Sequence, residues 1–262
     1  RGVFRWWRMN AYTFKHDLDN RLSNRLRIKS VISLYDYTGV AAIPWAKRGY
    51  QVYCFDLQHD DSRIDYYQDS GGSIHYIKAD LHDYDYICAI GESFAFENVQ
   101  FAMAFPVCTD LAVSGAAHFA NKAKIDPEFQ DKAARYARWC GELFAEMKLP
   151  YYVENPVSRL ATLWRAPDHR FHPFQFGGYI AANEAVHPLY PDYIAPMDAY
   201  SKQTCLWTGG DFTMPEIDAV ECDSFGSSTQ HRKLGGKSMK TKNIRSATPR
   251  GFAEAIAVAN SK

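Results

Sequence analysis

Short apolar runs separated by polar turns dominate the chain between residues 30 and 156. Runs with β-branched and aromatic content predict five strands, at 30–35, 51–55, 74–79, 101–105 and 151–153. Apolar positions recur at helical spacing over 111–123 and 127–147, and shorter helices are predicted over 40–47 and 157–164. Further along, 198–207 resembles a strand and 251–260 a helix. Strands that alternate with helices are typical of an α/β fold.

An aspartate follows each of the first three predicted strands. Asp36 opens a tight turn that ends at Gly39, Asp56 ends the second strand, and Asp80 follows the third. A turn of this kind before a helix directs helix N–H groups at a ligand. A carboxylate about 20 residues beyond such a turn binds the ribose diol in nucleotide-binding folds. The pattern indicates a nucleoside-bearing cofactor, although acidic residues also begin many ordinary turns.

The fourth and fifth predicted strands lead to a cysteine and a glutamate. Pro106 ends the fourth strand, because proline has no N–H for a sheet, and Cys108 follows in the loop. Glu154 and Asn155 directly follow the fifth strand. A lone cysteine is more often a small buried thiol, and a lone glutamate is more often a loop acid or a helix cap. Together they form a candidate nucleophile and a candidate proton donor at one edge of a sheet.

Composition indicates one large folded domain, or one domain with a small appendage. The chain has 262 residues, of which 47% are hydrophobic and 15% aromatic. No apolar run approaches the ~20 residues of a membrane span. The six cysteines are scattered and include no Cys-x-x-Cys pair. We therefore expect a cytoplasmic protein with reduced thiols, no membrane partner and no metal.

Positive charge gathers at the two ends of a chain whose net charge is zero. Residues 1–29 carry eight Lys and Arg against two acids, and residues 224–253 carry seven with no acid. The segment 30–223 between them has a net charge of −13. The basic ends are either ordinary solvated faces or a surface that binds a polyanion such as DNA. Trp6 and Trp7 add groups that could stack on bases.

Taken in order, these residues resemble the DNA cytosine-5 methyltransferases, in the compact form encoded by phages. The segment 36–39 is similar to the family's Asp-x-x-x-Gly motif but is one residue shorter. The segment 105–108 resembles its Pro-Cys loop, and 154–156 its Glu-Asn-Val motif. Asp56 and Asp80 occupy the positions of the acids that contact the ribose and the adenine in this family. The segments 171–179 and 245–249 resemble regions near its Gln-x-Arg-x-Arg and closing Arg-x-Thr-Pro motifs. The resemblance covers roughly 30–260.

The resemblance implies a Rossmann-like α/β methyltransferase fold with a small C-terminal extension, and S-adenosyl-L-methionine as cofactor. The expected regions are a basic N-terminal arm (1–29), a catalytic domain (30–207), a reduced target-recognition segment (208–244) and a returning C-terminal helix (245–262). The catalytic residues would be Cys108 and Glu154. Cys108 would add to C6 of a cytosine flipped out of DNA, and the protonated Glu154 carboxyl would donate a hydrogen bond to N3. Asn155 would hold the nucleophile loop in place.

The remaining expected site residues divide into two groups. The residues expected to bind the cofactor are Asp36, Tyr37, Thr38, Gly39, Asp56, Leu57, Asp80 and Pro106. Those expected to contact the substrate or DNA are Asn155, Ser114, Lys202, Arg232, Lys237, Lys240, Lys242 and Arg245. Ser114 could instead belong to a simple turn after the nucleophile loop.

The sequence departs from the family pattern at several places. Val107 stands where the family has proline, and Thr109 where glutamine is usual. The Gln-x-Arg-x-Arg motif has no clear counterpart, and the next cation in that region is Lys202. Only about 40 residues separate Trp207 from Arg245, too few for the usual recognition domain. Two alternatives stay open: an enzyme of this fold that modifies a free cytosine nucleotide or uses a variant sulfonium donor, and a catalytically inactive DNA- or cofactor-binding relative.

Overall fold

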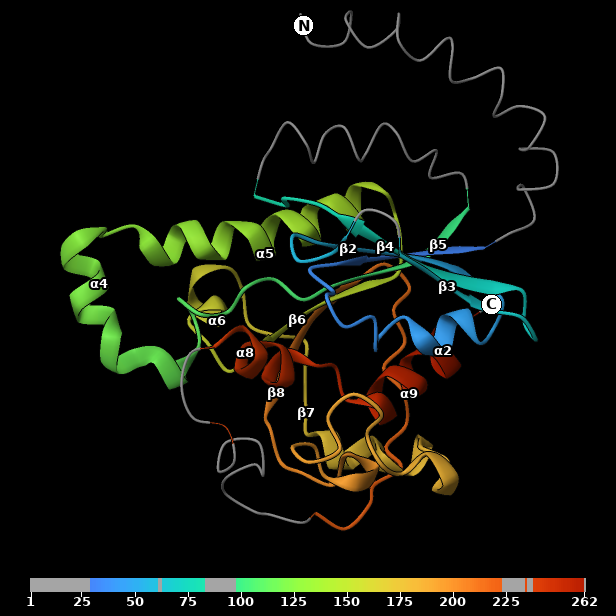
Figure 1. Cartoon of the computed structure of the whole chain (residues 1–262). Coiled ribbons are helices and arrows are strands. Elements are labelled where there is room, and N and C mark those ends of the chain that lie inside the picture. The colour runs from blue at the N-terminus through green and yellow to red at the C-terminus, as the bar shows by residue number, and fades with distance from the viewer. Residues whose placement is uncertain (1–28, 61–62, 83–97, 223–233, 235–237, 262) are drawn as a thin grey trace, which may run out of the picture.

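The computed structural model describes residues 29–60, 63–82, 98–222, 234 and 238–261. Its centre is an eight-stranded sheet with strand order β3-β4-β2-β1-β5-β6-β8-β7 (Figure 1). The strands are β1 (Ser30–Leu34), β2 (Gln51–Asp56), β3 (Ile64–Tyr67), β4 (Gly72–Lys78), β5 (Val99–Ala104), β6 (Tyr151–Pro156), β7 (His169–Phe171) and β8 (Thr204–Gly209). The predicted α/β fold is confirmed at this level.

Five neighbouring strands of this sheet are parallel: β4, β2, β1, β5 and β6. The chain winds outward from β1 through β2 to β4, then returns to the other side of β1 to form β5 and β6. The winding direction therefore reverses between β1 and β5, and open α/β sheets bind ligands at the carboxyl ends of the strands beside such a point. Strand β3 pairs antiparallel at one edge, and β8 runs antiparallel between β6 and β7.

Helices cover both faces of the sheet, as the hydrophobic pattern of its strands requires. Helix α5 (Phe129–Glu146) packs on one face through Ala137, Cys140 and Phe144. Helices α2 (Ile43–Ala46) and α9 (Arg250–Asn260) pack on the other face, where Trp45 and Phe252 are fully buried. The other helical segments are η2 (Val113–His118), α4 (Phe119–Ile125), α6 (Leu160–Leu163), η3 (Pro173–Tyr179), η4 (Ala182–Glu184), η5 (Pro196–Asp198) and α8 (Met239–Ser246).

Several predicted elements differ from the structure in length. The helix predicted over 40–47 begins only at Ile43, because Pro44 has no N–H to donate and fits only the first turn of a helix. The helix predicted over 157–164 is reduced to α6. The strand predicted over 151–153 continues to Pro156, because β8 pairs with it as far as Thr204. Glu154 and Asn155 therefore lie within β6 and not beyond it.

Other elements were missed or displaced in the prediction. Strands β3 and β7 are short, of four and three residues, and give almost no periodic signal. The strand predicted over 198–207 begins only at Thr204. The helix predicted over 111–123 starts as the 3-10 segment η2 and continues as α4, neither of which has a buried side chain. Figure 1 shows α4 to one side of the sheet, at the end of α5.

Candidate functional site

The carboxyl edge of the parallel strands carries most of the predicted site residues. The turn that begins at Asp36 follows β1, and the loop that contains Cys108 follows β5, on the two sides of the winding reversal. Asp56 ends β2 and Asp80 follows β4, while Glu154 lies near the end of β6. Residues far apart in sequence thus come to one edge of the sheet, as the prediction required.

Asp36 shapes the turn after β1 from inside. Its side chain is only 3% exposed, and its carboxylate accepts hydrogen bonds from the Gly39 N–H and the Ser33 hydroxyl, both at 2.8 Å. Gly39 has φ of +66°, and a Cβ at this position would lie 2.5 Å from the Tyr76 hydroxyl oxygen. The turn therefore needs glycine on two grounds. Asp36 therefore holds the turn in shape from inside, and Tyr37 is the side chain of the turn that points outward.

Asp56 and Asp80 are each fixed by a local turn. Asp56 Oδ1 accepts a hydrogen bond of 2.8 Å from the Gln58 backbone N–H, and Asp80 Oδ1 accepts one of 3.0 Å from that of His82. Each turn uses one carboxylate oxygen, and no described residue donates a hydrogen bond to the other. Two oriented carboxylates with an available oxygen suit the hydroxyl and amino groups of a nucleoside. Leu57, beside Asp56, is 59% exposed.

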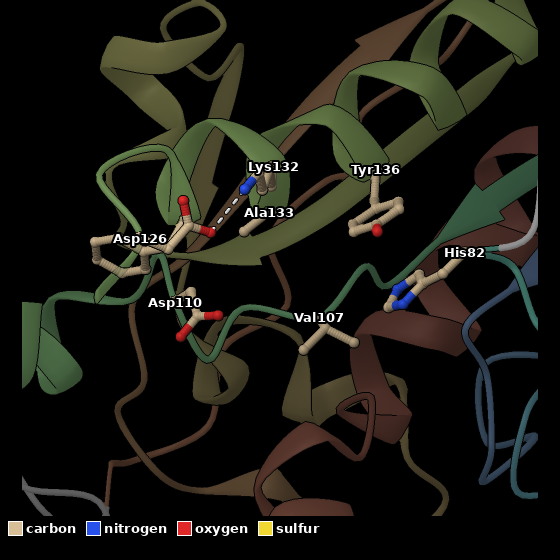
Figure 2. A pocket seen from close by; sticks show the side chains of 8 residues that line it. His82, Val107, Asp110, Asp126, Lys132, Ala133 and Tyr136 are labelled. Carbon is tan, nitrogen blue, oxygen red and sulfur yellow. Dashed lines mark hydrogen bonds and ion pairs between the residues drawn. The ribbon is translucent and has the colours of Figure 1, made fainter. Parts of the chain in front are cut away.

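A cavity of about 270 Å³ opens beside the ends of β4 and β5, on the face of the sheet that α5 covers (Figure 2). The His82 ring stacks on the Tyr136 ring, with centroids 3.9 Å apart and planes 16° apart. Val107, next to Cys108, forms part of the wall. The other lining residues are Asp110, Asp126, Phe129, Lys132 and Ala133. Phe129, Ala133 and Tyr136 follow the helical spacing that is typical of a core face, but they are half-buried and line this space.

Asn155 holds the loop that contains Cys108. Its side chain is 1% exposed, and its Nδ2 donates a hydrogen bond of 3.1 Å to the Pro106 carbonyl oxygen. The Cys108 carbonyl oxygen accepts bonds from the backbone N–H groups of Leu111 and Ala112, at 2.9 and 2.8 Å. The loop is thus fastened to β6 at one end and closed by a turn at the other.

Cys108 and Glu154 interact electrostatically at this edge. Burial raises the pKa of the Cys108 thiol, the nearby Glu154 carboxylate raises it further, and Lys202 opposes both effects. Burial also raises the pKa of Glu154, again opposed by Lys202. Glu154 Oε1 is buried and has no hydrogen-bond partner among the described residues. A carboxyl group with a raised pKa and an unengaged oxygen can, when protonated, donate a hydrogen bond to a substrate.

Helix α8 lies across the same edge. Lys202 Nζ donates a hydrogen bond of 2.8 Å to the Arg245 carbonyl oxygen, and Asn243 Nδ2 donates one of 3.1 Å to Gln58 Oε1. The helix therefore connects the loop after β2 with the segment before β8. Lys240 and Lys242 are exposed on it.

The other predicted DNA contacts fall in different places. The Arg245 guanidinium donates a hydrogen bond of 2.6 Å to the Leu234 carbonyl oxygen, so part of its hydrogen-bonding capacity is used within the protein. Ser114 is exposed in η2. Thr38 donates a 3.4 Å hydrogen bond to Asp36. Arg232 and Lys237 lie outside the described residues, as does the basic arm 1–29 except for Lys29.

The described residues contain no group of three or more His, Cys, Asp or Glu side chains that could hold a metal ion. No helix within the same ranges is long and apolar enough to cross a membrane.

Comparisons with known proteins give matches among solved structures and none among family models or curated proteins. No family model matches the sequence, and no curated protein matches it. The chain is similar to the solved structure of a candidate DNA modification methyltransferase encoded within a prophage of E. coli. The sequence identity is 12%, the TM-score is 0.38, and the match covers 74% of this chain and 53% of the other. The chain thus spans about half the length of that structure.

Proposed function

We propose that the protein is a DNA cytosine-5 methyltransferase that uses S-adenosyl-L-methionine. The main support for this proposal is that Cys108 and Glu154 interact near the ends of two adjacent parallel strands. These strands lie beside the point where the winding of the sheet reverses. A thiol next to a carboxyl of raised pKa combines a nucleophile with a proton donor. Cytosine C5 chemistry needs both groups, because C5 attacks an electrophile only after a nucleophile has added at C6.

The arrangement of the sheet supports a Rossmann-like methyltransferase fold for this site. Its parallel strands follow the order third, second, first, fourth, fifth, which is the order of doubly wound nucleotide-binding sheets. The antiparallel strand β8 and the helix α9 complete this sheet and cover one face of it. The catalytic domain would therefore be built from residues near both ends of the described chain. The segment with α8 and α9 would be the C-terminal extension, which returns to this domain.

Residues at the carboxyl edge of the sheet fit a nucleoside cofactor. Asp56 and Asp80 would accept hydrogen bonds from its ribose and adenine, and the cavity beside His82 and Tyr136 has room for a flat base. The further residues proposed to line this site are Asp36, Tyr37, Thr38, Gly39, Leu57 and Pro106. When bound, S-adenosylmethionine supplies a methyl group activated by a positively charged sulfur.

The chain's own residues account for the activation of the base. The Cys108 thiolate donates an electron pair to C6 and forms an S–C6 bond. The C5=C6 electrons then shift to C4–C5, and the C4=N3 electrons shift to N3, which takes the proton of the Glu154 carboxyl. C5 is now nucleophilic and would take the methyl group, while the electron pair of the broken sulfur–methyl bond would stay on the sulfur of the cofactor. Loss of the C5 proton to solvent reforms C5=C6 and expels the Cys108 thiolate, while Glu154 recovers its proton from N3.

DNA would approach the edge over which α8 lies. The target base must leave its stack to reach Cys108, as for other enzymes that modify a base within a duplex. Lys240 and Lys242, which are exposed on α8, would contact phosphates, and Ser114 in η2 lies in the segment that continues from the Cys108 loop. The same role is proposed for Arg245, and for Arg232 and Lys237 outside the described residues.

A covalent trap tests the proposal. DNA that carries 5-fluorocytosine has no C5 proton to lose, so the wild-type protein with S-adenosylmethionine should form an adduct that survives a denaturing gel. Cys108→Ser should form none. Cys222→Ser is the matched control, since Cys222 is half-buried like Cys108 but is not among the proposed site residues, and its adduct should equal that of the wild type. An adduct that persists in Cys108→Ser would assign the nucleophile to another residue.

A second measurement separates DNA from a nucleotide substrate. Turnover of free dCMP without any reaction on DNA would replace the DNA proposal with the nucleotide alternative. Absence of adduct and of turnover on both substrates would favour the inactive, binding relative.

A further inference from the structure

We infer that His59 arranges the cofactor site by tying the turn 36–39 to the loop that begins at Asp56. This inference deepens the proposed function and rests on it for its meaning, since both segments are proposed to contact the cofactor. His59 acts through these two segments, which makes it a positioning residue and not a catalytic one. It is a single histidine in a polar loop, where the sequence offers no periodic signal.

His59 is the buried residue of an exposed loop. It is only 5% exposed, whereas Leu57, Gln58 and Asp60 around it are all exposed. A ring that carries two nitrogen atoms is costly to bury unless its polar atoms are hydrogen-bonded. The loop therefore turns this one polar side chain inward for specific contacts, and those contacts show what it holds.

The side chain of His59 is bonded to the backbone of the turn after β1. Its Nε2 lies 2.9 Å from the Asp36 carbonyl oxygen. A carbonyl oxygen can only accept, so Nε2 carries the hydrogen and donates it. The Asp36 N–H donates in turn to the Phe55 carbonyl oxygen, at 3.3 Å. Both backbone groups of Asp36 are thus bonded to β2 or to the loop that follows it, while the Asp36 carboxylate holds the Gly39 N–H.

Two tyrosine rings hold the imidazole in the orientation that this bond needs. The Tyr37 ring stacks on the His59 ring, with centroids 5.8 Å apart and planes 22° apart. The Tyr76 ring, from β4, meets the His59 ring edge-on, with centroids 5.1 Å apart and planes 73° apart. Tyr76 also lies against Gly39, where a Cβ would come within 2.5 Å of its hydroxyl oxygen. The imidazole therefore lies between the turn and β4, and its rotation is restricted from two sides.

The backbone of His59 closes the turn that orients Asp56. The His59 N–H donates to the Asp56 carbonyl oxygen at 3.3 Å, and the Gln58 N–H donates to the Asp56 carboxylate at 2.8 Å. One residue thus fixes the turn 36–39 and the loop of the proposed ribose acid relative to each other. Binding segments that are arranged before a ligand arrives lose less entropy when it binds. Loss of the His59 donor should therefore weaken cofactor binding and leave the chemistry at Cys108 unchanged.

Calorimetric titration with S-adenosylmethionine tests this separation. His59→Phe keeps a ring between the two tyrosines but removes the donor, and should raise the Kd about tenfold. His59→Gln keeps an N–H donor at a similar reach, and should bind within about twofold of the wild type. In turnover on DNA, His59→Phe should raise the KM for S-adenosylmethionine by the same factor, with kcat unchanged at saturating cofactor. The matched control His75→Phe changes a histidine of β4 that stacks on Tyr53 and is bonded to the Ser73 hydroxyl, and should bind like the wild type.

Hydrogen exchange measures the same coupling without any ligand. The Gly39 N–H is bonded to the Asp36 carboxylate, so its exchange reports on the shape of the turn. Exchange in the peptide 36–42, followed by mass spectrometry, should be faster in His59→Phe than in the wild type. His59→Gln and His75→Phe should exchange like the wild type. If His59→Phe does not fold, His59→Asn serves instead, because its shorter side chain is polar but cannot reach the Asp36 oxygen.

The outcomes decide the inference separately from the proposed function. Unchanged exchange in a folded His59→Phe would overturn it, and so would an equal loss of affinity in His75→Phe. Equal Kd values for the wild type and His59→Phe would also overturn it. The proposed function fails on a different result, a wild-type protein that binds no S-adenosylmethionine and forms no 5-fluorocytosine adduct. In that case the exchange measurement alone decides whether His59 ties the two segments together.

Discussion

Asp198 is a buried acid outside the catalytic centre. It is fully buried, and its Oδ2 accepts a hydrogen bond of 3.0 Å from the Gly251 N–H in the first turn of α9. Its Oδ1 is also buried and has no partner among the described residues. Burial raises the pKa of Asp198 from 3.8 to about 6, although Gly251 and Arg250 oppose the change. The folded protein therefore binds the Asp198 proton more tightly than the unfolded chain does.

The first prediction concerns the pH dependence that this acid creates. Because the folded pKa is the higher one, stability from this group is fully present below about pH 4 and is lost as the pH rises through about 6. Asp198→Asn keeps an acceptor for Gly251 and suits the positive φ of 50° at this position. At pH 8 the variant should be more stable than the wild type by about 3 kcal/mol. Below pH 4 the two should be equal.

Urea unfolding at several pH values measures this difference directly. Subtracting the variant's free energy of unfolding from that of the wild type cancels every other titrating group. A difference that does not change between pH 4 and pH 8 would show that Asp198 is ionised and satisfied in the folded protein.

At the scale of elements, the interface between α5 and the ends of β4 and β5 determines cofactor binding under the proposed function. Ala133→Leu adds three carbon atoms inside the cavity, next to the stacked rings of His82 and Tyr136. We expect this variant to lose most of the rise in melting temperature that S-adenosylmethionine or its demethylated product gives to the wild type. Ala145→Leu, at an exposed position of the same helix, should keep the full rise.

The rise in melting temperature also tests the cavity assignment itself. Equal shifts in Ala133→Leu and the wild type would place the cofactor elsewhere along the carboxyl edge. No shift in the wild type with either ligand would remove the cofactor from the proposal.

The strands that carry the candidate site were predictable from the sequence, whereas the contacts between loops were not. The positions of Asp56 and Asp80 at strand ends were predictable, because a strand has a local hydrophobic pattern and the sequence shows directly which acid follows it. The stacking of His82 on Tyr136 was not, since it joins residues 54 positions apart whose spacing on a helix indicates only a core face. Lys202 was recognised as a cation near the site, but its bond to the Arg245 carbonyl depends on how α8 docks.

On the scale of the whole molecule, lysines lie at both edges of the sheet. Helix α8 crosses the carboxyl edge through its contacts with Gln58 and Lys202, and it exposes Lys240 and Lys242. Lys47 and Lys148 lie at the opposite edge, shortly before β2 and β6 begin. If DNA binds over Cys108, the lysines of α8 contact its phosphates and those at the amino edge do not. Comparing the lysines at the two edges therefore distinguishes a DNA-binding surface from a general effect of positive charge.

The last prediction uses this comparison. Binding of duplex DNA should weaken with salt, with a log–log slope of about −0.9 for each phosphate neutralised. The double variant Lys240→Gln, Lys242→Gln should reduce the magnitude of this slope by about two, because it removes two such contacts. The double control Lys47→Gln, Lys148→Gln changes net charge equally and should keep the wild-type slope. Equal slopes for the two double variants would place DNA away from α8 and would separate the basic C-terminal segment from the candidate site.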